Sequence, residues 1–505
     1  MSQRNIDVQI SQDTIIHSKR RIGRVLLLIS IITLLFFFCQ FGFNEEVNIP
    51  SVSQRSIVVS PGNKSTDLLI KAINKLCNGG EINLLSGIYK IKKTILIEGV
   101  KNLVIKGVPG NTNLITAFEP PAGGSSLILI NNCKNIRLEG LSLKGIEVPG
   151  ILPEKSIDIF KNPKKFGYYS ENIYWTRPPL PKGTYYRKIE HRLLSGIRVV
   201  NSENIMIAKC SLTKFTEWAI NVGLFVDKTL TGNKRLPGPC KNIYILDNHI
   251  YNTYKDGIHL MDTENGIIRG NIVENTGDDN ISVTNCYTPS RKIIMSENIC
   301  NGCICRGIAV FMEPGADLGE EEIVGDEIII ANNVIRNTAM GISVGFDPPD
   351  KIPNSFWSNI IISNNVCQNM YYSGIYLSKV KGAIVTGNIV ENARLSKKMG
   401  ASYEFRKSSG MAYRNISKGW HLPEHLIWMP DEEDKKGFFT DMLIYDILPE
   451  KISGYIGKQI IYKDANGRHF LCVLTQTGWK KLELHNLDIK RNLFGDKHEI
   501  GKRNE

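Results

Sequence analysis

Apolar and polar positions follow one pattern that recurs six times between Tyr244 and Asn392. Each copy reads as an apolar pair, an asparagine, a second asparagine or glycine four places later, and then a small residue followed by apolar-x-apolar. The first asparagines are separated by 23, 27, 35, 32 and 23 residues. They are Asn248, Asn271, Asn298, Asn333, Asn365 and Asn388. Apolar residues that alternate with period 2 predict short β-strands rather than helices.

The second turn residue and the strand after it fix the alignment of the copies. The second position holds Asn252, Asn275, Gly302, Asn337, Asn369 and Asn392. The inward residues of the strands are then Ile258/Leu260, Ile281/Val283, Ile308/Val310, Ile342/Val344 and Ile375/Leu377. Two less regular copies lie around residues 196–199 and 210–222. An asparagine that recurs at one turn predicts a ladder of side-chain amides bonded to one another and to turn backbone.

Repeats of this length, built from short strands and turns, indicate a solenoid, because one unit cannot bury its apolar face alone. The pattern resembles the right-handed parallel β-helix of the pectate-lyase-like superfamily over roughly residues 56 to 395. Residues 67–73 resemble the short helix that opens such domains, and residues 79–82 and 87–89 their first strands. We therefore expect an all-β, single-stranded parallel β-helix. A leucine-rich solenoid would need a leucine spacing that is absent here.

The N-terminus predicts a membrane anchor. Residues 25–43 form an apolar run long enough to span a bilayer, and Lys19, Arg20, Arg21 and Arg24 precede it. The basic flank is expected to stay cytoplasmic, which places the rest of the chain outside the cytoplasm. A cleaved signal peptide is the alternative, but no small-x-small cleavage site follows the run. We expect an uncleaved signal-anchor and a single-pass membrane protein.

The chain is thus divided into five parts. We expect a basic tail at 1–24, the transmembrane signal-anchor at 25–43, a linker at 44–55, the β-helix at 56–396 and a C-terminal module at 397–505. An insertion at 147–192, rich in aromatic and basic residues, interrupts the β-helix. The C-terminal module is expected to cap the solenoid or to bind a partner, and Asn466-Gly467 predicts a hairpin within it.

Charge and cysteine content narrow the partners. A net charge of +12 favours an acidic polymer or an anionic surface, although an even excess of solvated charge explains it equally well. No nucleic-acid-binding motif accompanies the charge, so no nucleic-acid partner is expected. The 11 cysteines include Cys300 and Cys367 at inward strand positions, where they are expected to pack as small core residues. A disulfide from Cys286 to Cys303 or Cys305 is left open.

The position just before each repeat strand forms a column when the copies are aligned. It reads Ser195, Trp218, Asp256, Asp279, Arg306, Met340 and Ser373. Adjacent strands lie about 4.8 Å apart, so acid, acid and base on successive coils are close enough to act on one substrate. Because unpartnered ionised carboxylates are costly to bury, we expect Asp256 and Asp279 in an open cleft. Aspartate is also favoured at turns, which is the structural alternative.

A second column lies on the outward face of the same strands. It reads Arg198, Asn221, His259, Ser282, Ala309, Ser343 and Tyr376, and its middle positions are polar. A polar outward column beside an acid cluster indicates a binding groove. We expect Arg198, Asn221, His259, Ser282 and Tyr376 to contact substrate.

The acids resemble those of the polygalacturonase-type glycoside hydrolases (family 28), whose motifs include Asn-Thr-Asp and then Gly-Asp-Asp on the next coil. Asp256 stands 22 and 23 residues before Asp278 and Asp279, which places these acids on neighbouring coils. The resemblance implies inverting hydrolysis, in which Asp278 protonates the leaving oxygen while Asp256 and Asp279 activate water. This mechanism needs one protonated and one ionised carboxyl group, roughly 6.5 to 9.5 Å apart. It requires no cofactor and no metal.

The chain also departs from that family. Tyr254-Lys255 replaces the Asn-Thr, Arg306 replaces a histidine, and no Arg-x-Lys follows on the next coil. These departures argue against polygalacturonic acid itself as the substrate. We therefore expect a polysaccharide-active glycoside hydrolase that acts on an acidic or complex glycan, with Arg306 at the cleavage point.

Three alternatives remain open on the same scaffold. A polysaccharide lyase would hold Ca²⁺ on Asp256 and Asp279 and use Arg306 as the base. A uronan C5-epimerase is suggested by residues 345–350, similar to the Tyr-Gly-Phe-Asp-Pro-His motif of mannuronan epimerases, although Pro349 replaces its histidine. The third alternative is a non-catalytic surface protein that binds glycans or adheres to cells.

Overall fold

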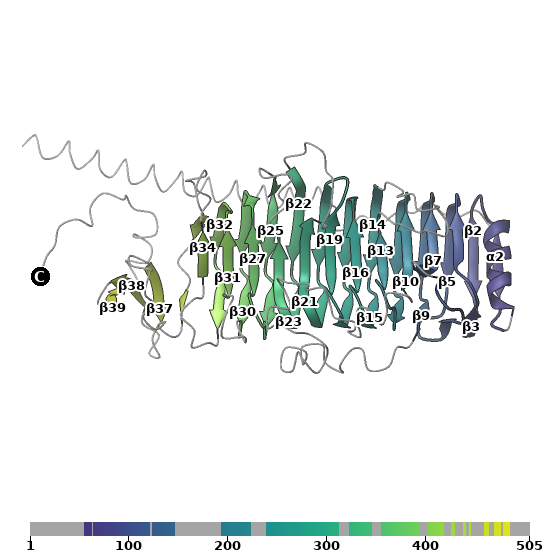
Figure 1. The fold of residues 1–505 in the computed structure, drawn as a ribbon, viewed down its shortest axis with the longest axis horizontal. Helices are drawn as coiled ribbons and strands as arrows, with labels where there is room; N and C mark the ends of the chain where they lie inside the picture. The colour runs from purple at the N-terminus through teal and green to yellow at the C-terminus, as the bar shows by residue number, and fades with distance from the viewer. Residues whose placement is uncertain are drawn as a thin grey trace, which may run out of the picture. The chain divides into compact units, whose positions relative to one another are not determined.

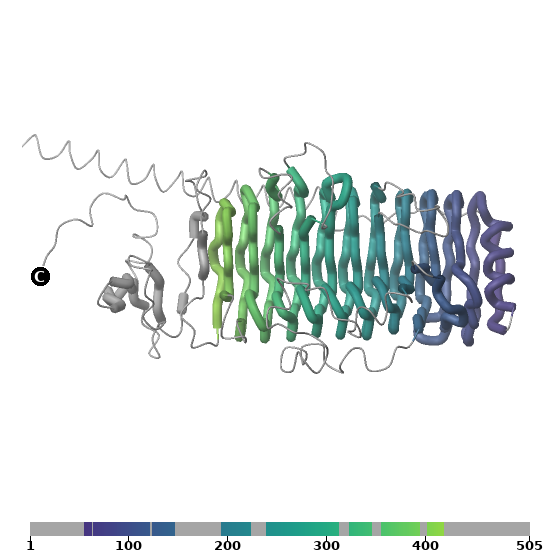
Figure 2. Tube along the Cα trace, viewed as in Figure 1, coloured from purple at the N-terminus to yellow at the C-terminus, as the bar shows by residue number. Residues whose placement is uncertain are grey.

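The chain forms stacked coils, each of which contributes strands to parallel faces (Figure 1). The computed structural model describes residues 55–62, 64–121, 124–146, 193–223, 239–312, 323–345, 355–393 and 401–418, and the backbone of β34 to β39. Consecutive coils lie side by side along the stack, as the continuous tube shows (Figure 2). Each strand therefore pairs with the equivalent strand of the coils before and after it.

Three faces run along the stack, here called faces 1, 2 and 3. Face 1 contains β1 (Ser56–Val59), β2 (Gly80–Leu84), β5 (Lys101–Lys106), β8 (Lys134–Glu139), β11 (Glu203–Ala208), β14 (Cys240–Leu246), β17 (Thr263–Arg269), β20 (Ser290–Ser296), β22 (Ile323–Ala331), β25 (Ile360–Ser363), β29 (Ala383–Thr386), β32 (Gly410–Tyr413) and β35 (Phe438–Thr440). Two short strands, β24 (Phe356–Ser358) and β28 (Val380–Lys381), pair beside it.

Faces 2 and 3 share two long strands. Face 2 contains β3 (Gly87–Ile91), β6 (Thr112–Thr116), β9 (Ser142–Lys144), β12 (Ser211–Thr213), β15 (His249–Thr253), β18 (Ile272–Thr276), the first halves of β21 (Ile299–Met312) and β23 (Val334–Val344), β26 (Val366–Gln368), β30 (Ile389–Glu391), β33 (Ile416–Lys418) and β36 (Ile444–Tyr445). Face 3 contains β4 (Ile95–Glu98), β7 (Ser125–Asn131), β10 (Leu194–Val200), β13 (Ile220–Val222), β16 (Ile258–Met261), β19 (Ile281–Asn285), the second halves of β21 and β23, β27 (Ile375–Ser378), β31 (Tyr403–Arg406) and β34 (Leu426–Met429).

One helix closes the first coil. Helix α2 (Ser65–Lys75) packs against β1, β3 and β4 and buries Leu69, Ala72 and Ile73 in the core. The sequence predicted a short helix at residues 67–73, and the structure confirms it. Its apolar face covers the open end of the stack, which would otherwise expose core side chains to water.

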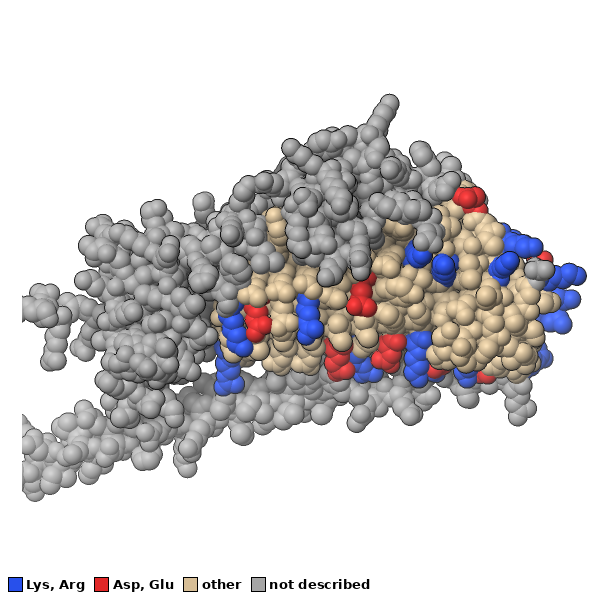
Figure 3. Space-filling model, turned by 90° about the horizontal axis from the view of Figure 1, so that it is seen from below, with Lys and Arg blue, Asp and Glu red and all other residues tan. Residues whose placement is uncertain are grey.

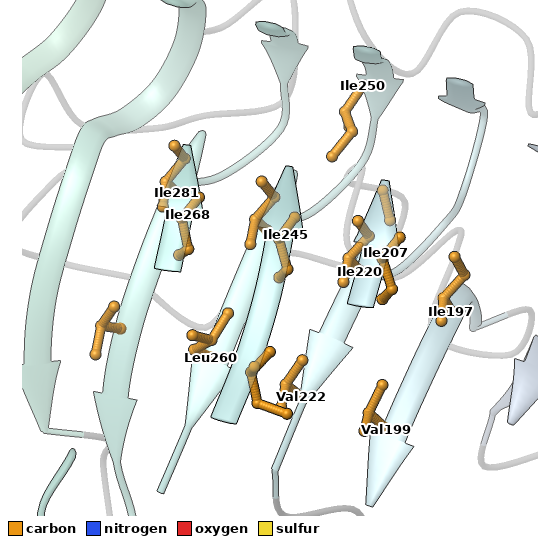
Figure 4. Packing of buried hydrophobic residues seen from close by; sticks show 14 of the residues in the cluster. Ile197, Val199, Ile207, Ile220, Val222, Ile245, Ile250, Leu260, Ile268 and Ile281 are labelled. Atoms are coloured by element: carbon orange, nitrogen blue, oxygen red, sulfur yellow. The ribbon is translucent and has the colours of Figure 1, made fainter. Parts of the chain in front are cut away.

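The core is filled by inward side chains that repeat from coil to coil. Ile220 and Val222 on β13 pair with Ile258 and Leu260 on β16, and all four are completely buried (Figure 4). Cys300 and Cys367 are also completely buried, as expected for small core residues. Strict alternation thus holds within the strands, and the sequence alignment predicted the inward set correctly.

The predicted amide ladder is present and buried between faces 1 and 2. In each step, a backbone N–H and an Nδ2 donate to Oδ1 of the asparagine on the next coil, at 2.9 to 3.1 Å. Each Nδ2 also donates to a backbone carbonyl, as Asn333 does to Met295 at 2.9 Å. The ladder continues past Asn388 to Asn415, beyond the six copies that the sequence defined. Every amide is therefore satisfied without water.

The second turn position requires a left-handed backbone. Its residues Asn252, Asn275, Asn337, Asn369 and Asn392 have φ between +52° and +61°, and Gly302 has φ +77°. Only glycine and asparagine adopt this region readily, which explains why no other residue type occupies the position. A third asparagine series at the start of face 1, which the alignment missed, has the same conformation: Asn102, Asn135, Asn204, Asn242 and Asn265.

Parallel pairing continues beyond the expected end of the β-helix at residue 396. Strands β31, β32 and β33 pair with β27, β29 and β30 in the register of the earlier coils. The predicted hairpin is confirmed by antiparallel pairing of β37 (Gln459–Lys463) with β38 (His469–Thr475), which pairs in turn with β39 (Gly478–Leu484). The boundary was missed because the asparagine spacing becomes irregular before Asn415.

Several expectations fall on residues that the structure does not describe. These are the tail and anchor at 1–43, the insertion at 147–192 and residues 346–350 of the epimerase-like stretch. Within the described ranges no helix is long and apolar enough to cross a membrane, so the signal-anchor stays a prediction. No disulfide joins the cysteines of the described ranges, and the bond considered for Cys286 is not formed. On the face in Figure 3, acidic and basic side chains are interspersed.

Candidate functional site

Asp256, Asp279 and Arg306 lie on three successive coils, directly before the face 3 strands. The backbone N–H of Gly257 donates to Asp279 O at 3.1 Å, and that of Asn280 donates to Arg306 O at 2.9 Å. These bonds align the three residues in the column that the sequence repeat predicted. The stacking of the coils therefore brings two acids and a base to the same edge of face 3.

Arg306 and Asp279 form a buried two-point ion pair. Oδ1 of Asp279 accepts hydrogen bonds from the backbone N–H and Nε of Arg306, both at 2.8 Å, and its Oδ2 lies 2.8 Å from Nη2. The guanidinium carbon lies 4.0 Å from the centroid of the Phe311 ring. The fork of donors and the aromatic ring fix both the position and the orientation of the charge.

Asp256 and Asp278 complete the acid cluster, which we define as Asp256, Asp278 and Asp279. Oδ1 of Asp256 accepts from the backbone N–H of Asp279 at 3.1 Å, and Oδ2 accepts from the Ser282 hydroxyl at 2.7 Å. Asp278 is close enough for its charge to raise the pKa of both neighbours. The predicted acids therefore converge.

The expectation of an open cleft for these acids is wrong. Asp256 and Asp278 are 5% exposed and Asp279 is 1% exposed. Burial is tolerated because Asp279 has a guanidinium partner and Asp256 has an N–H and a hydroxyl donor, which replace the hydrogen bonds of water. The sequence argument considered only carboxylates without partners, and periodicity does not show where such partners lie.

Burial and mutual repulsion bring the cluster's protonation close to neutral pH. Burial, with the charge of Asp278, raises the pKa of Asp256 to about 6 against the opposing effects of His259 and Ser282. Burial raises the pKa of Asp279 to about 7, although Arg306 opposes it, and the other two acids add to the rise. Protons are therefore gained and lost in the pH range where a general acid and a general base are most effective.

The outward column of face 3 is in register along the stack. Pairing aligns Arg198, Asn221, His259, Ser282, Ala309, Ser343, Tyr376 and Glu404. His259 lies beside the acid cluster, with Nε2 2.8 Å from Thr284 Oγ1. Ser282 contacts Asp256 directly, whereas Tyr376 lies four coils from His259, roughly 19 Å along the stack. The structure thus brings His259 and Ser282 to the acids, and leaves Tyr376 apart on the same face.

Sequence reasoning missed a second charged group on the N-terminal side of the acids. Glu217 accepts hydrogen bonds from Arg198 and from the Ser195 hydroxyl, the latter at 2.9 Å, and Lys255 Nζ lies 3.6 Å from it. A signal for it existed one place before the column that was analysed. That column reads Glu217, Lys255, Asp278, Cys305, Ala339 and Tyr372. Its charged residues occupy three successive coils.

One group of side chains has metal-ligating atoms close together. Carboxylate oxygens of Asp278 and Asp279 and the sulfur of Cys305 lie within 4.8 Å of one another. Ca²⁺ takes six to eight oxygen ligands, whereas this set includes a thiol and a carboxylate whose two oxygens already bind Arg306. The donor set therefore does not fit Ca²⁺.

Comparison with known proteins bears on the fold. No model of a protein family matches the sequence, and no curated protein matches it. A hyperthermoactive exopolygalacturonase from Thermotoga maritima superposes with a TM-score of 0.50 at 13% identity, over 79% of this chain and 93% of that chain. The chain has the right-handed parallel β-helix fold of the pectate-lyase-like proteins.

Two further solved β-helix structures are similar to this chain at lower scores. The A-module of the mannuronan C-5 epimerase AlgE6 from Azotobacter vinelandii has a TM-score of 0.49 at 11% identity, over 76% of this chain and 89% of that chain. A polygalacturonase from Erwinia carotovora has a TM-score of 0.47 at 13% identity, over 78% and 97%. At such identities the likeness concerns the β-helix alone.

Proposed function

We propose that this β-helix protein is a polysaccharide-active enzyme that hydrolyses glycosidic bonds in an acidic or complex glycan. One observation carries the proposal: three carboxyl groups on two successive coils are buried together, and the pKa of Asp256 and of Asp279 is raised toward neutrality. A carboxyl group with such a pKa both gives and takes a proton near pH 7, as glycoside hydrolysis requires. The likeness to an exopolygalacturonase is compatible with it.

The contacts of each acid suggest its role in this proposal. Asp279 is held by Arg306 through both carboxylate oxygens and keeps a positive charge beside the reacting bond. Asp256, oriented by Ser282 and by the backbone N–H of Asp279, accepts a proton from the attacking water. Asp278 gives its proton to the oxygen of the leaving sugar. Water then adds to the anomeric carbon as the glycosidic C–O bond breaks, so atoms and charge balance.

A lyase using the same residues is less well supported. A lyase of this type needs Ca²⁺ to hold a uronate and a base to remove the C5 proton. The donor set does not suit Ca²⁺, and Arg306 binds Asp279 through Nε and Nη2. We therefore expect chelators to leave the activity unchanged.

The test is the Asp278→Asn variant, which keeps the shape of the side chain and removes its proton. We expect the release of reducing ends from a panel of uronic-acid-rich and neutral glycans to fall roughly 100-fold or more. Asp247→Asn is the matched control, because Asp247 is exposed on another part of the coil. Undiminished hydrolysis by Asp278→Asn would sink the proposed site. An unsaturated, ultraviolet-absorbing product lost on chelation would replace hydrolysis with a lyase.

A further inference from the structure

Charged and aromatic side chains gather on the coils just before the acid cluster. Glu217, 5% exposed, accepts hydrogen bonds from Ser195 and Arg198. Trp218 follows it and lies one coil before Asp256, since the N–H of Ala219 donates to Asp256 O at 3.2 Å. This group is distinct from the acid cluster, yet it faces the same side of the stack.

The group carries a surplus of positive charge. Arg198 and Lys255 each contribute one positive charge, and Glu217 contributes one negative charge. Burial raises the pKa of Glu217, but the charges of Arg198 and Lys255 outweigh burial and hold it below its usual value. Glu217 is therefore ionised near neutral pH, which leaves one net positive charge in a partly buried place.

Lys255 is the cation that a ligand can reach. Its side chain is 23% exposed, whereas that of Arg198 is 2% exposed. Its Nζ lies 3.6 Å from Glu217 Oε1, beyond ordinary hydrogen-bond length, and 4.5 Å from the centroid of the half-buried Trp218 ring. An ammonium group has three donors, so the aromatic ring positions this one while leaving hydrogen-bonding capacity.

Lys255 does not serve mainly to neutralise the acid cluster. It lowers the pKa of Glu217, whereas the basic group that lowers the pKa of Asp256 is His259. His259 also stacks at a tilt on Trp218, with 4.9 Å between ring centroids. The indole therefore lies between the histidine beside the acids and the cation beside Glu217.

A second, independent observation points to a ligand here. Asn221 lies between Arg198 and His259 in the outward column and is 2% exposed. Its Oδ1 accepts no hydrogen bond from any residue in the described part of the chain. A buried amide oxygen without a donor costs roughly 1 to 3 kcal/mol, which a ligand hydroxyl would recover.

We propose that Trp218, Lys255 and Asn221 form a subsite for a sugar that carries an anionic group, on the N-terminal side of the acid cluster. The ammonium of Lys255 binds the carboxylate or sulfate, the indole covers the apolar face of the ring, and Asn221 Oδ1 accepts a hydroxyl. This inference deepens the proposed function and rests on it, since the ligand is taken to be a glycan. It fixes on which side of the scissile bond the anionic sugar lies.

The experiment measures binding, so that catalysis does not enter. In the full-length Asp278→Asn background, calorimetry at low salt compares a uronic acid oligosaccharide, its carboxyl-reduced neutral counterpart and a sulfated neutral oligosaccharide. We expect Lys255→Met to weaken binding of an anionic ligand about tenfold and to leave the neutral one unchanged. Lys255→Arg keeps the charge and should retain most of the affinity. Lys241→Met, at an exposed site on face 1, controls for net charge.

The outcomes separate this inference from the proposed function. Equal losses for charged and neutral ligands in Lys255→Met, or no preference for a charged ligand in its parent, would overturn the subsite. If glycan is cleaved while Lys255→Met leaves charge selectivity intact, the hydrolase stands and the subsite falls. If selective binding depends on Lys255 but the unmutated protein cleaves no glycan, the subsite stands and the hydrolase falls. Binding of only one of the two anionic ligands identifies the group as carboxylate or sulfate.

Discussion

The asparagine ladder and the acid cluster are both buried and polar, yet they differ in kind. In the ladder each neutral amide is bonded to its copy on the next coil, and the same contact recurs from Asn248 to Asn415. The acid cluster occurs once, carries charge and shifts the pKa of its own members. A polar contact that repeats along the stack indicates a role in holding the coils, whereas a charged one that does not repeat indicates a role in chemistry.

The largest effect on this comparison is expected from Arg306→Met. The change leaves Asp279 buried without its ion-pair partner, and it should lower the free energy of unfolding by about 3 to 5 kcal/mol at pH 8. The loss should shrink at pH 5, where Asp279 takes up a proton. Denaturant titration at both pH values measures it, with Arg306→Lys as the charge-retaining control. An equal loss at both pH values would contradict a role for the Asp279 charge.

A smaller effect is expected from breaking the ladder with Asn333→Leu. Asn333 Oδ1 accepts from the N–H and Nδ2 of Asn298, and its own Nδ2 donates to Met295 O and to Asn365 Oδ1. Leucine leaves these buried groups unpaired, so the free energy of unfolding should fall by about 3 kcal/mol at every pH. Asn113→Ala, whose side chain bonds only to Asn111 O, should cost under about 0.5 kcal/mol. A marked pH dependence for Asn333→Leu would blur the comparison.

The smallest effect is the pH dependence of stability itself. The pKa of Asp256 is raised from 3.8 to about 6 in the folded chain, so the folded state holds more protons than the unfolded state between these values. Its favourable contribution is therefore complete below pH 4 and is lost as pH rises through about 6, on the order of 2 kcal/mol. Asp256→Asn should flatten this part of the stability curve in denaturant titrations. An unaltered slope would mean that Asp256 is ionised throughout.

Much of the fold was predictable because side-chain identity at its corners is set by backbone conformation. Left-handed turns select asparagine or glycine, and the inward amide selects asparagine, so their spacing reveals the register. The same register placed Asp256, Asp279 and Arg306 on successive coils. It also predicted that Cys300 would lie in the core.

The rest of the site depends on contacts that spacing does not encode. The alignment gave no reason to couple Glu217 with Arg198, because the two side chains come from different columns and meet only through the turn. Burial of the acids follows from the donors of Arg306 and Ser282, and these appear only when side-chain directions are known. Where the asparagine spacing becomes irregular, as before Asn415, even the end of the repeat was misjudged.

The lengths of the connections show how such a scaffold separates permanence from variation. From β8 onward, two residues always join face 1 to face 2, and one of them is the ladder residue or its equivalent. The long connections instead flank face 3, as between Lys144 and Leu194, Val222 and Cys240, and Met312 and Ile323. Insertions at these points leave the coil register unchanged while altering what surrounds the acid cluster. Natural selection can therefore change the choice of glycan by lengthening one side of the coil, with the ladder on the other side untouched.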